Sequence, residues 1–132
     1  MILLDTHAAV WLAIDDGLGR RSQRIVGKAL ADDRLAISAI SFWEIAMLIG
    51  KGRLRALKSA GELRAKLLMA GIRELPVSGE IAVLAAELEG LGGDPADRMI
   101  AATAIAHEAA LMTADRNLLR WRHRLQRHDA EE

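Results

Sequence analysis

Short apolar runs alternate along the chain with longer segments in which apolar residues recur every three to four positions. Continuous apolar runs are typical of buried strands in a parallel sheet, and the longer period is typical of amphipathic helices. The pattern predicts four strands, at residues 1–5, 34–40, 72–77 and 110–115. It predicts helices between and after them, at residues 6–14, 22–33, 41–52, 59–71, 78–93, 94–109 and 116–121.

This alternation implies an α/β domain whose central, mostly parallel β-sheet is covered by helices on both faces. A length of 132 residues fits a single domain over 1–132. Residues 122–132 are polar and typical of a tail without fixed structure. Thr6 and Ser41 are the expected N-caps of two helices, and Asp94 followed by Pro95 is the expected start of a third.

The composition excludes several classes of protein. The chain has no cysteine, which rules out disulfides and cysteine-based metal sites and is typical of a cytoplasmic protein. Asp5 and His7 interrupt the first apolar stretch, so we expect neither a signal peptide nor a membrane-spanning helix. Eighteen basic residues balance eighteen acidic ones, which argues against binding nucleic acid by bulk charge but leaves local patches open.

Four acidic residues stand where the predicted elements meet one edge of the sheet. Asp5 and Asp115 follow the first and last predicted strands, and the carboxyl ends of parallel strands lie at the same edge. Glu44 and Asp97 lie near the N-termini of two predicted helices. Because α/β sheets bind ligands outside the carboxyl ends of their strands, we expect these four side chains to converge on one site.

Carboxylates that converge in a partly buried patch repel one another and call for a positive counter-charge. Oxygen ligands without histidine or cysteine favour Mg²⁺ or Mn²⁺, which lower the pKa of bound water and neutralise a scissile phosphate. The acids therefore predict metal-dependent phosphodiester hydrolysis. Singly, Asp5 and Asp115 also suit helix caps, and Asp97 suits the helix dipole. Glu44, inside an apolar stretch, has the weakest structural explanation.

Four segments of the chain resemble the PIN-domain nucleases, and among them the VapC-type toxins of toxin–antitoxin pairs. They are LLDTH at 3–7, ISAISFWEIAMLIGKGRL at 37–54, DPADRMIAATA at 94–104 and LMTAD at 111–115. The resemblance implies an α/β/α sandwich and an endoribonuclease that hydrolyses RNA with a metal-activated water. It assigns the four acids to a catalytic site for Mg²⁺ or Mn²⁺. It also implies a cognate antitoxin protein as partner and a homodimer or higher assembly.

Residues around the acids receive weaker assignments. Thr6, Ser41 and Thr113 match positions that line the family's site, and helix capping or strand packing explains them equally well. RNA binding needs local positive charge, for which we single out Arg98, Lys51, Arg53 and Arg116. A solvated surface explains any one of these cations as well.

Two departures from the family pattern concern the rim of the site and hence substrate preference. Ala96 stands where the family often has an aromatic residue, and LGG at 91–93 stands where many relatives have a histidine. Trp121 is a candidate for stacking on a base, whereas Trp43 suits the core.

Two other functional classes fit parts of the pattern. A phosphatase or receiver-type domain would use Asp5 as phosphoacceptor, but it would need a second acid beside Asp5 and a late lysine. No lysine follows residue 66. A non-catalytic binding module would keep the PIN fold and act through a protein partner. The presence of all four acids argues against that reading, and metal binding without RNA turnover would favour it.

Overall fold

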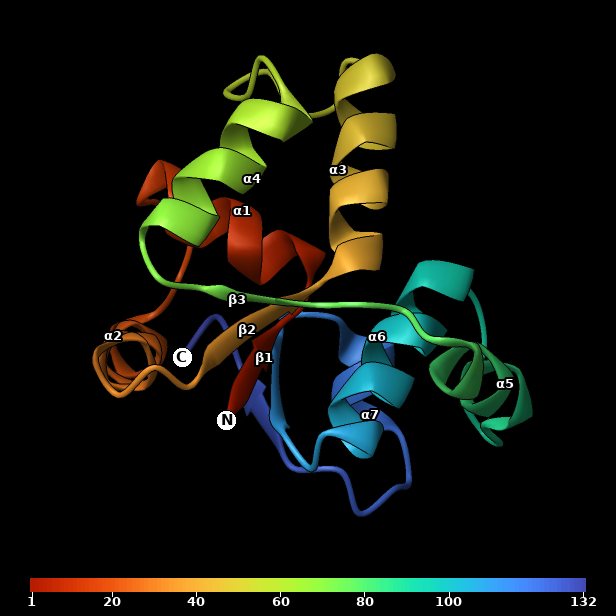
Figure 1. The fold of residues 1–132 in the computed structure, drawn as a ribbon. Coiled ribbons are helices and arrows are strands. Elements are labelled where there is room, and N and C mark those ends of the chain that lie inside the picture. The colour runs from red at the N-terminus through yellow and green to blue at the C-terminus, as the bar shows by residue number, and fades with distance from the viewer.

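Five short strands form one sheet in which every neighbouring pair runs parallel, in the order β3-β2-β1-β4-β5 (Figure 1). The structure is a computed structural model and describes all residues from 1 to 132. The strands are β1 Ile2–Leu4, β2 Leu35–Ser38, β3 Arg73–Leu75, β4 Ala110–Thr113 and β5 Arg127–Asp129. The expected α/β architecture with a parallel central sheet is confirmed.

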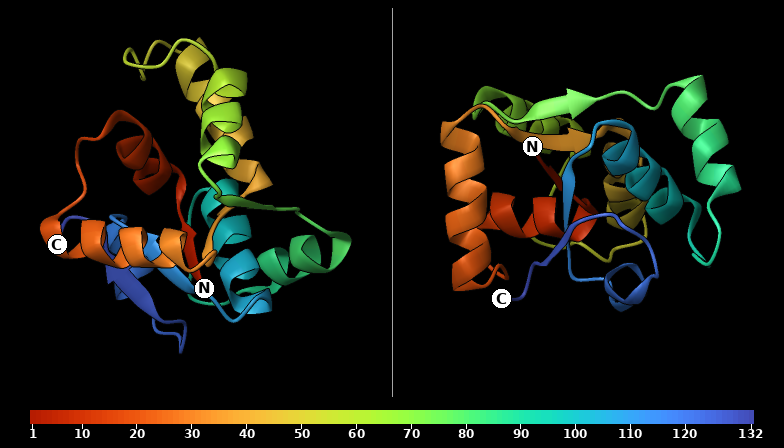
Figure 2. Two further views of the ribbon diagram at one scale, coloured as in Figure 1. Left: turned by 60° about the vertical axis from the view of Figure 1, so that its left-hand side comes forward. Right: turned by 90° about the horizontal axis from the view of Figure 1, so that it is seen from below.

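Seven helices connect the strands and cover the sheet (Figure 1 and Figure 2). They are α1 Thr6–Ile14, α2 Arg20–Ala31, α3 Ala39–Gly50, α4 Ala60–Met69, α5 Gly79–Glu87, α6 Pro95–Ala106 and α7 Arg116–Arg120. None of these helices combines the length and the apolarity needed to cross a membrane.

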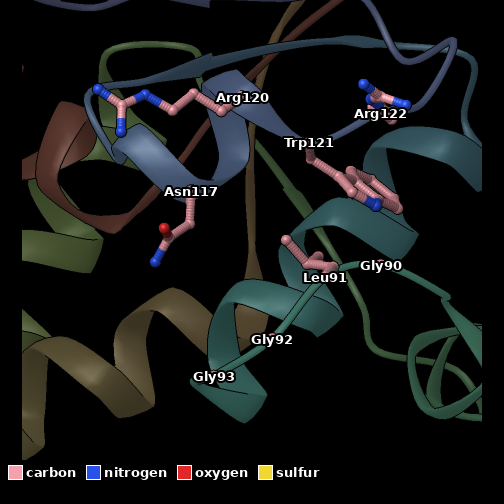
Figure 3. Close-up of a pocket in the computed structure, with 8 residues that line it drawn as sticks. All are labelled: Gly90, Leu91, Gly92, Gly93, Asn117, Arg120, Trp121 and Arg122. Carbon is pink, nitrogen blue, oxygen red and sulfur yellow. The ribbon is translucent and has the colours of Figure 1, made fainter.

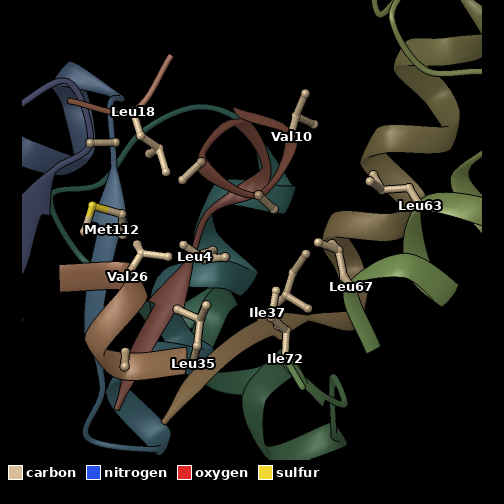
Figure 4. Packing of buried hydrophobic residues seen from close by; sticks show 14 of the residues in the cluster. Leu4, Val10, Leu18, Val26, Leu35, Ile37, Leu63, Leu67, Ile72 and Met112 are labelled. Carbon is tan, nitrogen blue, oxygen red and sulfur yellow. The ribbon is translucent and has the colours of Figure 1, made fainter. Parts of the chain in front are cut away.

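Alternate residues of the central strands build two separate cores, one on each face of the sheet. Leu4, Ile37 and Met112 point to one face and pack with residues of α1, α2, α3 and α4 (Figure 4). Leu3 and Leu111 point to the opposite face and pack with α6 and α7. Because side chains of a strand alternate between faces, uninterrupted apolar runs are required at strands buried on both sides.

The carboxyl ends of β1 and β4 lie side by side at the centre of the sheet. Leu4 is paired in register with Met112, and the Asp5 N–H donates to the Met112 carbonyl at 3.0 Å. The helices that follow both strands start at once, α1 at Thr6 and α7 at Arg116. Polar groups placed after these two strands therefore share one end of the sheet.

The structure corrects the expected tail at residues 122–132. Residues 127–129 form β5, which pairs with β4, and Ala130 is fully buried. The Gly19 N–H donates to the Ala130 carbonyl at 2.9 Å, and the Ala130 N–H donates to the Thr113 carbonyl at 2.8 Å. Main-chain bonds hold this segment, which explains why its polar side chains gave no strand signal.

Two expected helix caps are also wrong. Asp5, not Thr6, caps α1, because its carboxylate accepts from the Ala8 N–H at 2.8 Å. Ser38, not Ser41, caps α3 by accepting from the Ile40 N–H. Thr6 is the first residue of α1, and α3 begins two residues earlier than expected, so Thr6 and Ser41 lie inside their helices with buried side chains.

Candidate active site

A cavity of about 340 Å³ opens where β1 and β4 end, and all four predicted acids line its walls. The complete lining is Asp5, Thr6, His7, Trp11, Glu44, Asp94, Asp97, Ala114, Asp115 and Glu131. The lining contains neither lysine nor arginine. The sheet edge thus gathers carboxylates from β1, β4, α3 and α6 into one hollow.

Thr113, the last residue of β4, links the two acids that follow the central strands. Its hydroxyl donates to Asp5 Oδ2 and accepts from the Asp115 N–H, the latter at 3.0 Å. Thr113 is fully buried and Asp5 is only 5% exposed. Asp5 and Asp115 also cap α1 and α7. The same two carboxylates therefore cap helices and line the acidic cavity.

The tightest group of carboxylates comes from α3 and the start of α6. One oxygen each from Glu44, Asp94 and Asp97 lie within 4.8 Å of one another. Asp94 is expected only as a helix cap from the sequence, and it does accept from the Ala96 N–H at 2.9 Å. The three-residue spacing of Asp94 and Asp97 was the available signal, because residues i and i+3 share a helix face.

Glu131 is the second acid that the sequence analysis missed. It reaches the cavity from the segment after β5. Its N–H donates to Asp129 Oδ1 at 3.0 Å, which helps to fix the chain there. No sequence signal could have placed Glu131, since its position depends on the pairing of β5 with β4.

Burial and mutual repulsion disfavour the charged forms of these acids. Desolvation, followed by the charges of Asp115, Asp94, Glu44 and Asp5, raises the pKa of Asp97 from 3.8 to about 7. The pKa of Glu44 is raised mainly by burial and further by the charge of Asp94. Burial likewise raises the pKa of Asp5, although the Thr113 hydroxyl and the Ala8 N–H oppose that rise.

The donor set fits a hard divalent cation. Six carboxylates line the cavity, and neither lysine nor arginine is present to neutralise them. His7 is the one other lining residue that can carry a charge. Oxygen-only sites of this kind suit Mg²⁺ or Mn²⁺ better than zinc. A bound cation would remove the repulsion that raises the pKa of Asp97.

Two hydroxyl residues connect the helices that carry the acids. The Thr6 hydroxyl donates to Ser41 Oγ at 3.2 Å, and both side chains are buried. This contact joins the first turn of α1, next to Asp5, to α3 one turn before Glu44. Of the three predicted accessory residues, Thr6 lines the cavity, whereas Ser41 and Thr113 act from behind it.

Two of the four predicted RNA-contacting cations are engaged within the protein. Arg98 donates to the carbonyls of four residues, Ala85, Ala86, Leu88 and Leu91. Its guanidinium holds the loop before α6, an arrangement that does not favour the predicted RNA contact at Arg98. Arg116 pairs with Asp129 at 2.9 Å and with Glu131 at 3.9 Å, although its side chain stays half-exposed. Lys51 and Arg53 are exposed in the turn after α3.

The expectations for two tryptophans are reversed. Trp121 is 5% exposed, its Nε1–H donates to the Glu89 carbonyl at 2.8 Å, and its ring stacks on His123 with centroids 4.3 Å apart. It is a core residue and is not available to stack on a base. Trp43, expected in the core, is 56% exposed on α3.

Comparison with known proteins agrees with this geometry. The PIN domain family matches residues 2–123, and the chain belongs to that family. Ribonuclease VapC22 of Mycobacterium tuberculosis is 35% identical over 125 residues, which cover 92% of each chain. The chain is therefore a homologue of the VapC ribonucleases.

Solved structures share the fold over essentially the whole chain. A chain of the VapBC2 complex from Rickettsia felis, solved with a promoter DNA fragment, is similar with a TM-score of 0.69, 24% identity and 98% coverage of both chains. A chain of VapBC-1 from nontypeable Haemophilus influenzae gives a TM-score of 0.65 at 23% identity, with complete coverage of both chains.

Proposed function

We propose that the protein is a Mg²⁺- or Mn²⁺-dependent endoribonuclease that acts as the toxin of a toxin–antitoxin pair. The observation that carries this proposal is the cavity, which is lined by six aspartates and glutamates and contains neither lysine nor arginine. The kinship with a VapC ribonuclease supports RNA as the substrate class.

Glu44, Asp94 and Asp97 are the residues we assign as direct ligands, because their oxygens already lie within 4.8 Å of one another. Asp5 and Asp115 complete the site from the ends of the central strands. A cation bound there supplies a water of lowered pKa and charge neutralisation at the scissile phosphate. Thr113 keeps Asp5 in position through its hydroxyl, and it fixes the backbone of Asp115 through the Asp115 N–H.

A cognate antitoxin is the partner that we propose for the surface beside the cavity. Trp43 and Met47 lie one helical turn apart on α3, on either side of Glu44, and are 56% and 43% exposed. Exposed apolar side chains next to a functional cavity suit a protein partner. The similar chains from VapBC complexes support an antitoxin in this role, with a homodimer or higher assembly as the wider arrangement.

Cleavage of a total-RNA pool by the purified chain tests the proposal. Reactions contain Mg²⁺, Mn²⁺ or EDTA, and the wild type is compared with Asp97→Asn and with the matched control Asp32→Asn. Asp32 is exposed at the end of α2, away from the cavity. We expect discrete metal-dependent products from the wild type and from Asp32→Asn, and none from Asp97→Asn.

Other outcomes separate the alternative functions. Equal cleavage by Asp97→Asn would show that the site is wrongly assigned. Binding of metal by the folded, antitoxin-free chain without cleavage of any RNA would favour a non-catalytic binding module. A phosphoryl group trapped covalently on Asp5 would favour a phosphatase or receiver-type domain.

A further inference from the structure

A second hollow, of about 470 Å³, lies next to the acidic cavity (Figure 3). One wall is the loop of residues 90–93, and the other is formed by Asn117, Arg120, Trp121 and Arg122 at the end of α7. We call this hollow the basic groove. Gly93 directly precedes Asp94, and Asn117 is two residues after Asp115, so the same two segments line both hollows.

The two neighbouring hollows have opposite charge. The basic groove contains two arginines and no acid, whereas the acidic cavity contains no lysine or arginine. Arg120 and Arg122 are exposed, and neither guanidinium makes a hydrogen bond or ion pair within the chain. Arg98 and Arg127, by contrast, are bound to main-chain carbonyls. The basic groove therefore presents free positive charge beside the carboxylates.

The glycine-rich wall of the groove adds one main-chain donor. The Glu89 carbonyl accepts from Trp121 Nε1, and the Leu91 carbonyl accepts from the Arg98 guanidinium. Every peptide bond is trans, so the Gly92 N–H points away from the Arg98 guanidinium, whereas the Gly90 N–H points away from the Trp121 wall of the groove. The Gly92 N–H has no partner within the chain. A Cβ at Gly92 would meet nothing within 4 Å, which shows that the space beside it is open.

Two free guanidinium groups and an unpaired main-chain N–H in one hollow are components of a phosphate-binding surface. Figure 3 shows the Asn117 amide directed from α7 toward the Gly92–Gly93 segment, with the Arg120 and Arg122 side chains on opposite sides of the view. The apolar lining residues, Leu91 and Trp121, are each 5% exposed. The groove thus exposes no large apolar side chain that could anchor a protein partner, and its two free arginines favour a polyanion.

We propose that the basic groove binds the phosphodiester backbone of the RNA strand next to the scissile bond. This inference rests on the proposed nuclease function. It gives the path of the RNA strand beyond the acidic cavity. An acidic cavity repels a polyanion, so the grip on the strand must come from adjacent cations. Arg120, Arg122 and the Gly92 N–H supply these contacts.

Equilibrium binding of a fluorescent single-stranded RNA in EDTA tests this inference over a range of salt concentrations. The variant is Arg120→Gln with Arg122→Gln. Its matched control is Arg24→Gln with Lys28→Gln, which removes the same charge from exposed positions of α2 on the opposite face of the sheet. We expect the groove variant to bind roughly tenfold more weakly, with the slope of log K against log salt reduced by about 1.4. The control should match the wild type.

A groove variant that binds RNA like its control would overturn the inference. If this variant instead lost affinity for the antitoxin alone, the groove would be a protein-binding surface, which also overturns it. Cleavage assays separate this failure from failure of the nuclease. If the wild type cleaves RNA and the groove variant cleaves it with the same KM, the RNA-binding role of the groove is refuted and the nuclease function is retained. If the groove variant binds RNA more weakly but the wild type cleaves no RNA in any metal, the RNA-binding role of the groove is supported and the nuclease function is refuted.

Discussion

Replacing Asp97 with asparagine should stabilise the metal-free protein at and above neutral pH, although Asp97 belongs to the candidate active site. The pKa of Asp97 is about 7 in the folded protein and 3.8 ordinarily, so between these values only the folded chain keeps the proton. The protonated carboxyl contributes stability that is complete below about pH 4 and is lost as the pH rises through about 7. Asparagine cannot ionise and has nearly the same shape, so the variant avoids this loss.

The magnitude follows from the two pKa values. A difference between 3.8 and about 7 corresponds to at most roughly 4 kcal/mol, because one pH unit is worth about 1.36 kcal/mol. The Asp97 side chain is only half-buried, and water screens its repulsion by the neighbouring carboxylates. We therefore expect the variant to gain about 1–2 kcal/mol in its free energy of unfolding near pH 8.

Urea unfolding in EDTA from about pH 4 to about pH 8 measures the effect. The gain of Asp97→Asn over the wild type should grow with pH and level off above about pH 7, while Asp32→Asn shows no such trend. Adding Mg²⁺ or Mn²⁺ should stabilise the wild type more than the variant, because binding to the folded state alone shifts the equilibrium. A variant as stable as the wild type, or less stable, near pH 8 would refute the account of repulsion at this site.

Two further substitutions test the supports of the site by urea unfolding. Arg98→Lys should lower the free energy of unfolding by about 2 kcal/mol, because an ammonium group cannot span the four carbonyls that the guanidinium holds. The control Arg53→Lys, at an exposed position, should leave that free energy unchanged. Equal stability of the two variants would contradict the role of Arg98. Thr113→Val should lose about 2–3 kcal/mol, because buried Asp5 loses a donor and a main-chain N–H loses its acceptor. The control is Thr103→Val at another fully buried threonine, whose hydroxyl bonds only a carbonyl of its own helix, so its free energy of unfolding should fall by less than about 1 kcal/mol. An equal loss in the two variants would argue against the role of the Thr113 hydroxyl in linking Asp5 to Asp115.

Most of the architecture could be predicted because buried parallel strands leave a distinct mark in the sequence. The runs that became β1, β2 and β4 are apolar on both faces, and the intervening segments repeat at the helical period. Asp5 and Asp115 were identifiable because each ends such a run. Glu44 stood out as a charge within an apolar segment. These signals are local, and a parallel sheet brings local positions of this kind to one edge.

The features that escaped prediction depend on contacts between distant parts of the chain. Arg98 meets four carbonyls only because the chain after α5 folds back over the start of α6. Glu131 reaches the cavity only because β5 pairs with β4. Asp94 was assigned a cap, and its second role appears only when α3 brings Glu44 beside it. Contacts of this kind, between residues far apart in the chain, leave no periodic pattern in the sequence.

The two edges of the sheet restrict how the protein can assemble. The edge strands β3 and β5 have three residues each, and ion pairs flank them: Arg73 with Asp33 and Glu74 with Arg64 at one edge, and Asp129 with Arg116 at the other. Short, charged edges disfavour the addition of a strand from another molecule, which protects the sheet from edge-to-edge aggregation. These edges therefore favour association through helix surfaces, such as the exposed side of α3, over association by strand addition.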